Sequence, residues 1–526
     1  MQHFNWEPLD KDFLNNAFEK ALSAYAHTAS AALNGVAALS KYTAEFFIPY
    51  LISTVYFQHV EKARLLKSSP LENIENYLGL LSFNMDLFRR AVGSASDWTH
   101  QYLAKEMERG FKAAMNTLYD RSGEDWETFL KRQADLTAVL AVKYPQAIEE
   151  IEKEFGLHFE RGDSIKAAET DRFLLYQVLP SDKAIESRQS AKPVLILPPF
   201  VLGANILAFL PKEKRSYVHS FADQGIPTYI RVLKDIQTTE PLQVMTGEDD
   251  ARDTRYFCEV IKSLHGKPVT LNGYCQGGFS GVCDLLSGEL DGLVDAFISC
   301  VAPMDGTRSK GLSEFLKGLP RRFNDLTYGI KTLANGNQVA DGKLMGWVYK
   351  LKSIESESPI AAFYRDLLMF SNQKTDSIQI SKSAAAINYW LGHERFDLPM
   401  EITKMSFASY NTPITEDGTL PVKLFGKTLN LKRLSEKKIK WLICYGENDD
   451  LVEKETALAP LDYVQAEVTS FPKGHVAIAT SWSHPESACA LHTRFGERNS
   501  RGPVRFQLDL DMEQGEPVKR KKTKKQ

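Results

Sequence analysis

The chain has 526 residues, of which 43% are hydrophobic, 11% aromatic and 25% charged, the composition of a globular protein with several cores. Its 64 Lys and Arg against 67 Asp and Glu leave a net charge of −3, which excludes a global field that would attract nucleic acid or anionic membranes. Six scattered cysteines without a C-x-x-C pair argue against a disulfide framework and a thiolate zinc site, and they indicate a cytoplasmic protein.

Residues 1–165 are predicted to form a helical N-terminal region. From Leu22 to Phe46 apolar residues step by three and four, which predicts a helix packed on a partner helix. Further helices are predicted over Trp126–Lys143 and Gln146–Phe155, separated at Pro145. The uncharged stretch in this region is interrupted by polar residues, so no transmembrane segment is expected.

A second long helix is marked by its N-terminus. Ser69 is placed to cap it, Pro70 suits its first turn and Glu72 completes a capping box. Apolar residues then repeat with helical spacing from Leu71 to Phe88. The whole region is interpreted as a helical packing domain, with a dimer interface or an apolar surface as further roles for its aromatic run.

From Asp171 onward short apolar runs alternate with amphipathic helices, the pattern of a mostly parallel sheet with helices on both faces. The predicted strands are Phe173–Val178, Val194–Leu197, Thr228–Val232, Val269–Leu271, Ala296–Ile298, Trp441–Tyr445 and Glu467–Phe471. Four segments follow the helical region: a first core part (166–304), a cap inserted into the core (305–410), a second core part (411–500) and a basic, disordered tail (501–526).

The stretch Gly273-Tyr274-Cys275-Gln276-Gly277-Gly278 joins a predicted strand to a predicted helix. This is the context of the nucleophile elbow of α/β-hydrolases, with cysteine in place of serine. The glycines Gly273, Gly277 and Gly278 fit a sharp turn in which side chains would collide with neighbouring strands. Cys275 is therefore the predicted nucleophile, although a tight turn with a buried structural cysteine would share this pattern.

A carboxylate and a histidine follow in the order that this fold requires. Asp449 comes after the strand Trp441–Tyr445, and His475 comes after the strand Glu467–Phe471. His475 is predicted to act as the general base toward Cys275, with Asp449 orienting its other nitrogen. Asp449 is preferred to Asp450 because the pattern G-x-x-D-x-x-V places it in the turn.

Two backbone N–H groups are candidates for an oxyanion hole. The Gln276 N–H lies at the N-terminus of the helix after the nucleophile, and the Val201 N–H lies in the loop after an early strand. The long interval between Cys275 and Asp449 holds the inserted cap, which is expected to exclude water from the nucleophile. No P-loop and no metal-ligand set is visible, so neither a metal nor a cofactor is expected.

The chain resembles the polyhydroxyalkanoate synthases over roughly residues 167–491. The resemblance rests on four stretches: the cysteine elbow with its third glycine, Pro198-Pro199 with the following Ile206-Leu207, residues 422–431, and Gly474-His475-Val476-Ala477. It implies an α/β-hydrolase core with a cap, (R)-3-hydroxyacyl-CoA as substrate, a polyester as product and CoA as the leaving group. It also implies a homodimer located in the cytoplasm at the surface of polyester granules.

The sequence departs from the family pattern near the expected substrate site. Phe200 stands where the family often has Trp, Asn205 where Tyr is common, and Ala208 in a stretch where the family usually has Leu-Asp. Trp390-Leu391-Gly392-His393 stands where the cap commonly reads Trp-Asn-x-Asp. Two alternatives therefore stay open: a cysteine thioesterase or small-molecule acyltransferase that does not polymerise, and a non-catalytic granule-associated protein.

Overall fold

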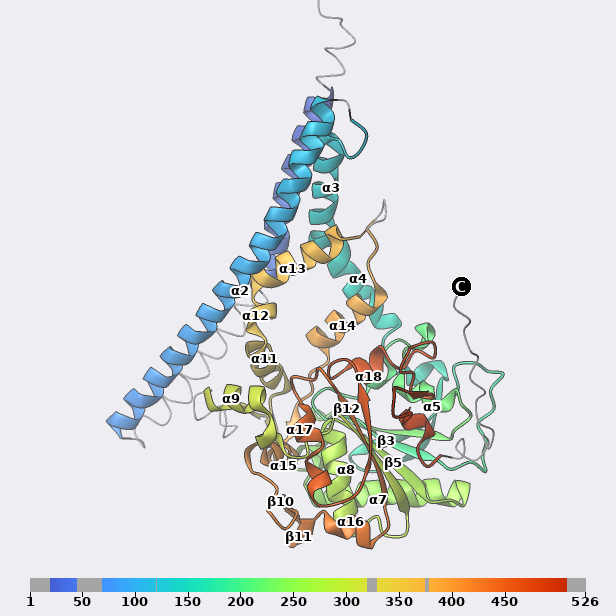
Figure 1. The fold of residues 1–526 in the computed structure, drawn as a ribbon. Coiled ribbons are helices and arrows are strands. Elements are labelled where there is room, and N and C mark those ends of the chain that lie inside the picture. Colours follow the sequence, from blue (N-terminus) through green and yellow to red (C-terminus); the bar gives the residue numbers. More distant parts are fainter. Residues whose placement is uncertain (1–18, 45–68, 120, 319–328, 374–377, 509–526) are drawn as a thin grey trace, which may run out of the picture. The chain divides into compact units, whose positions relative to one another are not determined.

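The computed structural model describes residues 19–44, 69–119, 121–318, 329–373 and 378–508 (Figure 1). It divides into two compact units. The helical unit comprises Met1–Ile151 and Trp347–Tyr389, and the sheet unit comprises Glu152–Gly346 and Trp390–Gln526. The five predicted segments differ from this division in one respect. The middle of the expected cap, Trp347–Tyr389, belongs to the same unit as the N-terminal helices. The predicted basic tail lies almost wholly outside the described residues.

The helical unit contains the longest described helix of the chain, α2, which is drawn in blue in Figure 1. Ser69 caps this helix by accepting a hydrogen bond from the Glu72 N–H at 3.2 Å, and Pro70 occupies its first turn. The predicted start of the helix is confirmed. The described elements are residues 19–44, α2 (Pro70–Leu118), α3 (Trp126–Ala138), α4 (Tyr144–Glu150), α12 (Ile354–Glu357) and α13 (Pro359–Ser371).

The predicted break at Pro145 is wrong, because α3 continues into α4 through a π-helical turn over Val139–Lys143. Proline has no N–H to donate to the carbonyl four residues earlier, which is that of Ala141. Here the Lys41 Nζ donates to the Ala141 carbonyl at 2.8 Å. The wider turn and this substitute donor together let the helix continue through the proline.

The first helix packs through only part of the predicted face, because Leu39 of the predicted seam packs against the buried cluster that contains Ala38. Leu22, Tyr25 and Val36, which belong to the predicted seam, are more than half exposed, whereas Ala38 is fully buried. Gly35 lies near α3, where an added Cβ would make an ordinary contact with the Thr137 Cγ2 at 3.9 Å.

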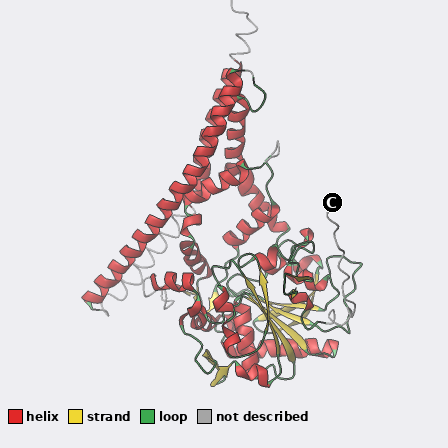
Figure 2. Ribbon diagram, in the orientation of Figure 1, coloured by secondary structure: helices red, strands yellow, loops and turns green. Residues whose placement is uncertain are grey.

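An eight-stranded sheet forms the centre of the sheet unit, in the order β1-β2-β4-β3-β5-β6-β12-β13 (Figure 2). The pairs from β4 to β13 are parallel, and β1 and β2 add antiparallel strands at one edge. The strands are β1 (Ser164–Glu169), β2 (Phe173–Val178), β3 (Val194–Leu197), β4 (Thr228–Leu233), β5 (Val269–Tyr274), β6 (Val294–Cys300), β12 (Lys440–Gly446) and β13 (Glu467–Phe471).

All seven predicted strands are present, with three of them at the predicted bounds. The strand β1 was not predicted. Its sequence Ser-Ile-Lys-Ala-Ala-Glu shows little alternation of polar and apolar residues, and its position at the edge of the sheet leaves most of its side chains partly exposed. Strands β3 and β5 are buried along their whole length, so both faces of the sheet are covered. The helices are α5 (Tyr217–Ala222), α6 (Glu240–Gln243), α7 (Gly247–His265), α8 (Gln276–Ser287), α9 (Lys310–Gly318), α15 (Met400–Asn411), α16 (Lys432–Glu436), α17 (Lys454–Ala457) and α18 (Ala477–Thr480).

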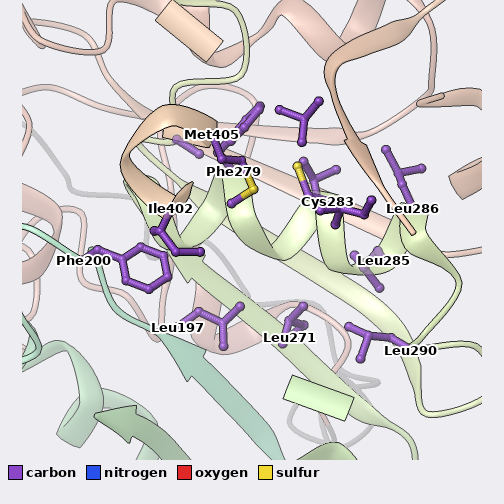
Figure 3. Close-up of a cluster of buried hydrophobic side chains, with 14 of the residues drawn as sticks. Leu197, Phe200, Leu271, Phe279, Cys283, Leu285, Leu286, Leu290, Ile402 and Met405 are labelled. Carbon is purple, nitrogen blue, oxygen red and sulfur yellow. The ribbon is translucent and has the colours of Figure 1, made fainter. Parts of the chain in front are cut away.

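The helix α8 is the structural centre of the core (Figure 3). Its Phe279, Cys283 and Leu286 lie between the strand residues Leu197 and Leu271 and the α15 residues Ile402 and Met405. Every residue of α8 is buried. The start of this helix is therefore held from the sheet side and from the side of α15 at once.

The remaining elements are short. Two helices, α11 (Gly342–Lys352) and α14 (Lys382–His393), run across the division between the units. Small antiparallel sheets are formed by β7 (Ile330–Thr332), β8 (Gln338–Ala340) and β9 (Leu398–Pro399), by β10 (Thr419–Leu424) and β11 (Lys427–Asn430), and by β14 (Arg494–Phe495) and β15 (Ser500–Arg501). Among the described residues, no helix has the length and apolarity that crossing a membrane requires.

Candidate active site

Cys275 occupies the sharp turn between β5 and α8. Its backbone has φ 51° and ψ −121°, a conformation that side chains disfavour. The Cys275 N–H donates to the Cys300 carbonyl on β6 at 2.8 Å, and the Cys275 carbonyl accepts from the Gly278 N–H at 2.9 Å. These two bonds fix the strained residue, which is the geometry of a nucleophile elbow.

The elbow glycines are required by close backbone approach. A Cβ on Gly277 would lie 2.1 Å from the Leu197 carbonyl oxygen, and one on Gly273 would lie 2.4 Å from the Gly277 carbonyl oxygen. A Cβ on Gly278 would lie 2.5 Å from the Ala302 Cβ. Since real Cβ atoms do not approach other atoms this closely, any side chain at these positions would force the backbone apart.

Asp449 and His475 meet beyond the ends of β12 and β13. The His475 Nδ1 lies 2.8 Å from the Asp449 Oδ2. The other oxygen of Asp449 accepts hydrogen bonds from the Leu451 and Val452 N–H groups, both at 2.9 Å. Asp449 is buried and the neighbouring Asp450 is exposed, so the structure pairs His475 with the carboxylate that the turn pattern favours.

The imidazole of His475 is held between two acidic groups. Burial lowers its pKa, but the Asp449 carboxylate and the Cys275 side chain outweigh burial and raise the pKa of His475 well above its ordinary value. Its Nε2 atom is buried and, among the described residues, has no hydrogen-bond partner of good geometry. Asp449 occupies the Nδ1 side of the imidazole and the Cys275 side chain interacts with the same ring, a set of groups suited to proton transfer.

The two predicted oxyanion donors lie next to each other, but one of them is already engaged. The Gln276 N–H is in the first turn of α8, where N–H groups have no acceptor within the helix. The Val201 N–H donates at 3.1 Å to the side-chain oxygen of Gln276. Val201 can therefore serve an oxyanion only after the Gln276 carboxamide turns away.

The Gln276 side chain is a site feature that sequence reasoning missed. Besides accepting from Val201, its carboxamide donates to the Ser406 hydroxyl on α15 at 3.2 Å. It thus ties the loop after β3 to α15 directly beside the nucleophile. The residue was visible in the motif, but its side-chain partners are 75 and 130 residues distant in sequence, and no local pattern connects them.

Tyr274, the residue before the nucleophile, also has a contact that the sequence did not reveal. Its hydroxyl donates to the main-chain carbonyl of His475 at 2.8 Å. The aromatic ring packs edge-on against the imidazole, with 6.4 Å between the ring centroids. The strand that carries the nucleophile therefore also positions the loop that carries the histidine.

Asn205, which departs from the polyester synthase pattern, and Trp390, which keeps it, both make hydrogen bonds in the segment that follows Val201. Asn205 donates to the buried Glu394 carboxylate at 2.7 Å, and Trp390 donates through its indole N–H to the Leu202 carbonyl at 3.3 Å. Burial raises the pKa of Glu394, and its second oxygen has no hydrogen-bond partner among the described residues. Two hydrogen bonds thus link residues 202–205, just after Val201, to residues 390–394.

Across the parts of the chain that the structure describes, no group of three or more His, Cys, Asp and Glu side chains could hold a metal ion. The site as described consists of side chains and backbone groups of the chain itself. Its chemistry is that of a nucleophile, a base and hydrogen-bond donors.

The sequence matches no protein-family model and no curated protein. Among solved structures, it is similar to a putative aryl esterase from Burkholderia cenocepacia, at 13% identity, 60% of this chain, 92% of that chain and a TM-score of 0.30. A thioesterase domain from the curacin biosynthetic pathway is 11% identical over 61% of this chain and 95% of its own, with a TM-score of 0.33. The α/β hydrolase GrgF from Penicillium sp. sh18 is 13% identical over 59% and 90%, with a TM-score of 0.30.

The strand order and the elbow define the class of the protein. A mostly parallel eight-stranded sheet, with the candidate nucleophile after β5 and the acid and histidine after later strands, is the α/β-hydrolase arrangement. The predicted fold class is confirmed, and the chain also has a helical N-terminal region.

Proposed function

We propose that the protein is a polyhydroxyalkanoate synthase-like acyltransferase that polymerises (R)-3-hydroxyacyl-CoA through a covalent acyl-cysteine. The observation that supports this most directly is Cys275 itself, a strained residue on the elbow that interacts with the buried His475–Asp449 pair. The family resemblance of the elbow supplies the substrate class. The third glycine, Gly278, packs against Ala302 as a member of that same turn.

In the first step the Cys275 thiolate attacks the thioester carbonyl of the acyl-CoA. The proton of the thiol passes to His475, whose imidazolium is stabilised by Asp449. A carbon–sulfur bond forms to Cys275, the carbon–sulfur bond to CoA breaks, and His475 returns the proton to the departing CoA thiolate. The Gln276 N–H is positioned to stabilise the oxyanion.

In the second step a 3-hydroxyl group attacks the acyl-cysteine. His475 takes the hydroxyl proton, a carbon–oxygen bond forms, the bond to Cys275 breaks, and the proton returns to the sulfur. The hydroxyl belongs to the next monomer or to the end of the growing chain. Each cycle therefore adds one ester bond and regenerates the free thiol.

The choice of cysteine follows from the energies of the two steps. Exchange of one thioester for another is nearly balanced, whereas transfer from a thioester to a hydroxyl is downhill. A cysteine thus keeps the acyl group activated until an alcohol arrives, and a serine ester would lose that driving force one step earlier. The product is a neutral polyester, and the proposed location is its granule surface in the cytoplasm.

A thioesterase or small-molecule acyltransferase is the second candidate. The observation that favours it is Asn205, which stands where the family commonly has Tyr and donates to the buried Glu394 carboxylate beside the candidate oxyanion loop. Water would then take the place of the hydroxyl in the second step. The two candidates share Cys275, His475 and Asp449, and they differ in what accepts the acyl group.

The proposal is tested by incubating the full chain with (R)-3-hydroxyacyl-CoA of several acyl lengths. Release of the CoA thiol is followed continuously, the acyl product is identified, and the acyl-cysteine is sought by intact-protein mass spectrometry. Insoluble polyester is the expected product. We expect Cys275→Ala to reduce thiol release by about 10³-fold or more.

The matched control is Cys489→Ala, because Cys489 is half-exposed in the same unit and lies outside the elbow. Its thiol release is expected to equal that of the unmodified protein. Free hydroxy acid without polymer would assign the thioesterase instead. Thiol release by Cys275→Ala at the unmodified rate would contradict both candidates.

A further inference from the structure

The loop that follows β3 is held by a segment from much later in the chain, residues 390–396. The Val201 carbonyl accepts a hydrogen bond from the Phe396 N–H at 3.3 Å. The Leu202 carbonyl accepts one from the Trp390 indole N–H, also at 3.3 Å. Both bonds lie within the sheet unit. They fix two successive carbonyl groups of the loop and so restrict the residue that carries the second candidate oxyanion donor, the Val201 N–H.

Gly203 shows how closely the same segment approaches the loop. Its φ of 68° lies in the left-handed region, which favours glycine. A Cβ at this position would lie 2.4 Å from the Cε2 atom of the Phe396 ring. The ring therefore packs directly on the backbone of the loop and occupies the space that a side chain at position 203 would need.

A pair of side chains completes the attachment. The Asn205 Nδ2 donates to the Glu394 Oε1 at 2.7 Å, and the Asn205 Oδ1 accepts from the Leu157 N–H at 3.0 Å. Gly156 leaves room for this amide, since a Cβ there would lie 2.7 Å from the Asn205 Cγ. Asn205 thus uses its donor toward Glu394 and its acceptor toward the main chain, and the two bonds together define how its carboxamide is oriented.

Glu394 is a buried acid that is only partly satisfied. It is 8% exposed, and its Oε2 atom has no hydrogen-bond partner in the ranges that the structure describes. Burial raises the pKa of its carboxyl group, while the hydrogen bond from Asn205 and the charges of Arg395 and His393 oppose this rise. Burying a polar group costs free energy unless its contacts compensate. The contact that a replacement of Glu394 would lose is the bond from Asn205.

We propose that Glu394 and Asn205 are positioning residues for the reaction at Cys275, because they hold the loop of Val201 where its N–H group can stabilise an oxyanion. The Val201 N–H already faces the elbow, since it donates to the Gln276 side chain at 3.1 Å. An oxyanion donor is effective only when it is held close to its required place, and loss of one donor lowers kcat by about 10² to 10³. The inference rests on the Cys275 site of the proposed function and does not require that a polyester is formed.

The polarity of the pair provides a test that is specific to this bond. Asn205→Asp keeps the acceptor for the Leu157 N–H but places a second carboxyl group opposite Glu394. Two carboxyl groups at this distance share one proton at low pH and repel each other once both are ionised. In the double variant Asn205→Asp and Glu394→Gln, the introduced amide donates to the introduced carboxylate. The bond then returns with its polarity reversed.

The readout is the acylation of Cys275 by p-nitrophenyl butyrate, measured as the initial burst of p-nitrophenolate. The thiol proton passes to His475, the sulfur bonds to the ester carbonyl carbon through an oxyanion, and p-nitrophenolate leaves with the electrons of the broken bond. Glu394→Met is expected to lower the burst rate constant at saturating ester on the order of 10²-fold. The ester concentration at half-saturation is expected to stay unchanged, since the oxyanion is absent from the bound ground state.

The conservative and the paired variants are expected to separate the bond from the bulk of the side chain. Glu394→Gln keeps an acceptor for Asn205 and is expected to stay within about threefold of the unmodified rate. The rate of Asn205→Asp, divided by the unmodified rate at the same pH, is expected to fall as pH rises from about 6 to about 9, because the shared proton is lost. The double variant is expected to recover to within about threefold of the unmodified rate at the upper pH.

Alkylation of Cys275 by iodoacetamide is the control for folding and for the nucleophile. It passes through no oxyanion, so its rate is expected to be the same in every variant. All variants are made in a Cys489→Ser background, because Cys489 is the described cysteine that is not buried. Glu401→Met, which replaces an exposed glutamate paired with Lys404 on α15, is the matched control for Glu394→Met and is expected to leave the burst unchanged.

An unmodified burst in Glu394→Met would overturn the proposal. Equal losses of burst and alkylation would also overturn it, because they would show a general effect on the elbow. A double variant no faster than Asn205→Asp at the upper pH would do the same. A burst that depends on Glu394, in a chain that forms no polyester from hydroxyacyl-CoA, would support the positioning role and contradict only the polymerisation. An unmodified chain without any burst would overturn both.

Discussion

The elbow of the sheet unit and the N-terminal half of α2 use their residues in opposite ways. At the elbow, a Cβ added to Gly277 would lie 2.1 Å from the Leu197 oxygen, and Cys275 is 3% exposed. On α2, a Cβ added to Gly79 would meet nothing within 4 Å, and Leu81 beside it is 59% exposed. The backbone of the elbow is thus tightly packed, whereas the described residues leave apolar side chains on the N-terminal half of α2 exposed.

The elbow and the N-terminal half of α2 differ in what stabilises them. The elbow is complete within one unit, because the Cys275 N–H donates to the Cys300 carbonyl on β6 and the Gln276 side chain donates to the Ser406 hydroxyl on α15. The N-terminal half of α2 differs, because the described residues leave its apolar row from Leu71 to Val92 exposed, whereas a helix gains most of its stability from burying its apolar face. The same substitution is therefore expected to have a large effect on activity or stability at the elbow and a small effect on α2.

The largest contrast is expected between two aspartates. Asp449→Asn removes the charge that holds the His475 imidazole, so we expect kcat for CoA release to fall by about 10³-fold to 10⁴-fold at neutral pH. Asp86→Asn on α2 removes only exposed salt bridges to Arg89 and Arg90 and is expected to leave kcat unchanged. Steady-state kinetics on both variants test the contrast.

The Asp449 variant also has a signature in stability. Because the pKa of His475 is raised in the folded state, its protonation stabilises the fold fully below about pH 6.5, the ordinary histidine value, and this contribution is lost as pH rises through the folded-state pKa. The unmodified protein should therefore lose more unfolding free energy than Asp449→Asn between pH 6 and pH 9. Equal pH slopes would show that Asp449 does not control His475.

Two glycines give the next contrast. Gly277→Ala places a methyl group against the Leu197 carbonyl and is expected to lower the unfolding free energy by about 3 kcal/mol, with loss of CoA release. Gly79→Ala replaces a glycine inside an open helix and is expected to raise it by about 1 kcal/mol. Denaturant titration measures both. A tolerated alanine at position 277 would show that the elbow backbone can relax.

Two substitutions at Gln276 separate charge from packing. Gln276→Glu leaves an acceptor on the Val201 N–H and adds a negative charge beside the developing oxyanion, so kcat is expected to fall by roughly 10². Gln276→Met keeps the length without an amide, frees Val201 and is expected to stay within about tenfold of the unmodified rate. Gln101→Glu, an exposed change on α2, is the control for added charge. Equal rates for the two Gln276 variants would remove Val201 from the oxyanion site.

The smallest effect is expected for the unfolding free energy when Asp284, a buried aspartate on α8, is replaced. Burial, with repulsion from Asp250, raises the pKa of Asp284 well above its ordinary value. The stability linked to its proton is complete below about pH 3.9 and is lost as pH rises toward the folded-state pKa. We expect Asp284→Asn to raise the unfolding free energy at pH 7 on the order of 1 kcal/mol, and near pH 4 to have no effect. Asp97→Asn on α2 is expected to change nothing at either pH.

The buried parallel strands could be predicted because their signals are local. Val194–Leu197 and Glu467–Phe471 are apolar or β-branched runs with helices or turns beside them, and the observed strands have the same bounds. Pro145 misled the prediction because its missing hydrogen bond is compensated by Lys41, about a hundred residues away. The packing face of residues 19–44 could be predicted only in part, since Leu39 packs as expected while Leu22 and Val36 are exposed and Ala38 is buried instead.

The candidate site shows the same limit. Cys275, Asp449 and His475 follow from strand–loop order, and the structure brings them together around one imidazole. The choice of Asp449 could be made from the turn pattern alone, because two N–H groups of that turn hold the carboxylate. The hydrogen bond from the Val201 N–H to the Gln276 side chain could not be predicted, since it depends on the side-chain rotamer of Gln276.

The positive φ of Cys275 bears on how such a site can change during evolution. The constraint lies in the backbone and in the glycines around it, and the reactive atom itself is free to differ. Exchanging sulfur for oxygen at this residue requires no space, whereas losing any one glycine requires the strands to move. Serine would therefore fit the same turn at position 275, whereas a side chain at position 273, 277 or 278 would not.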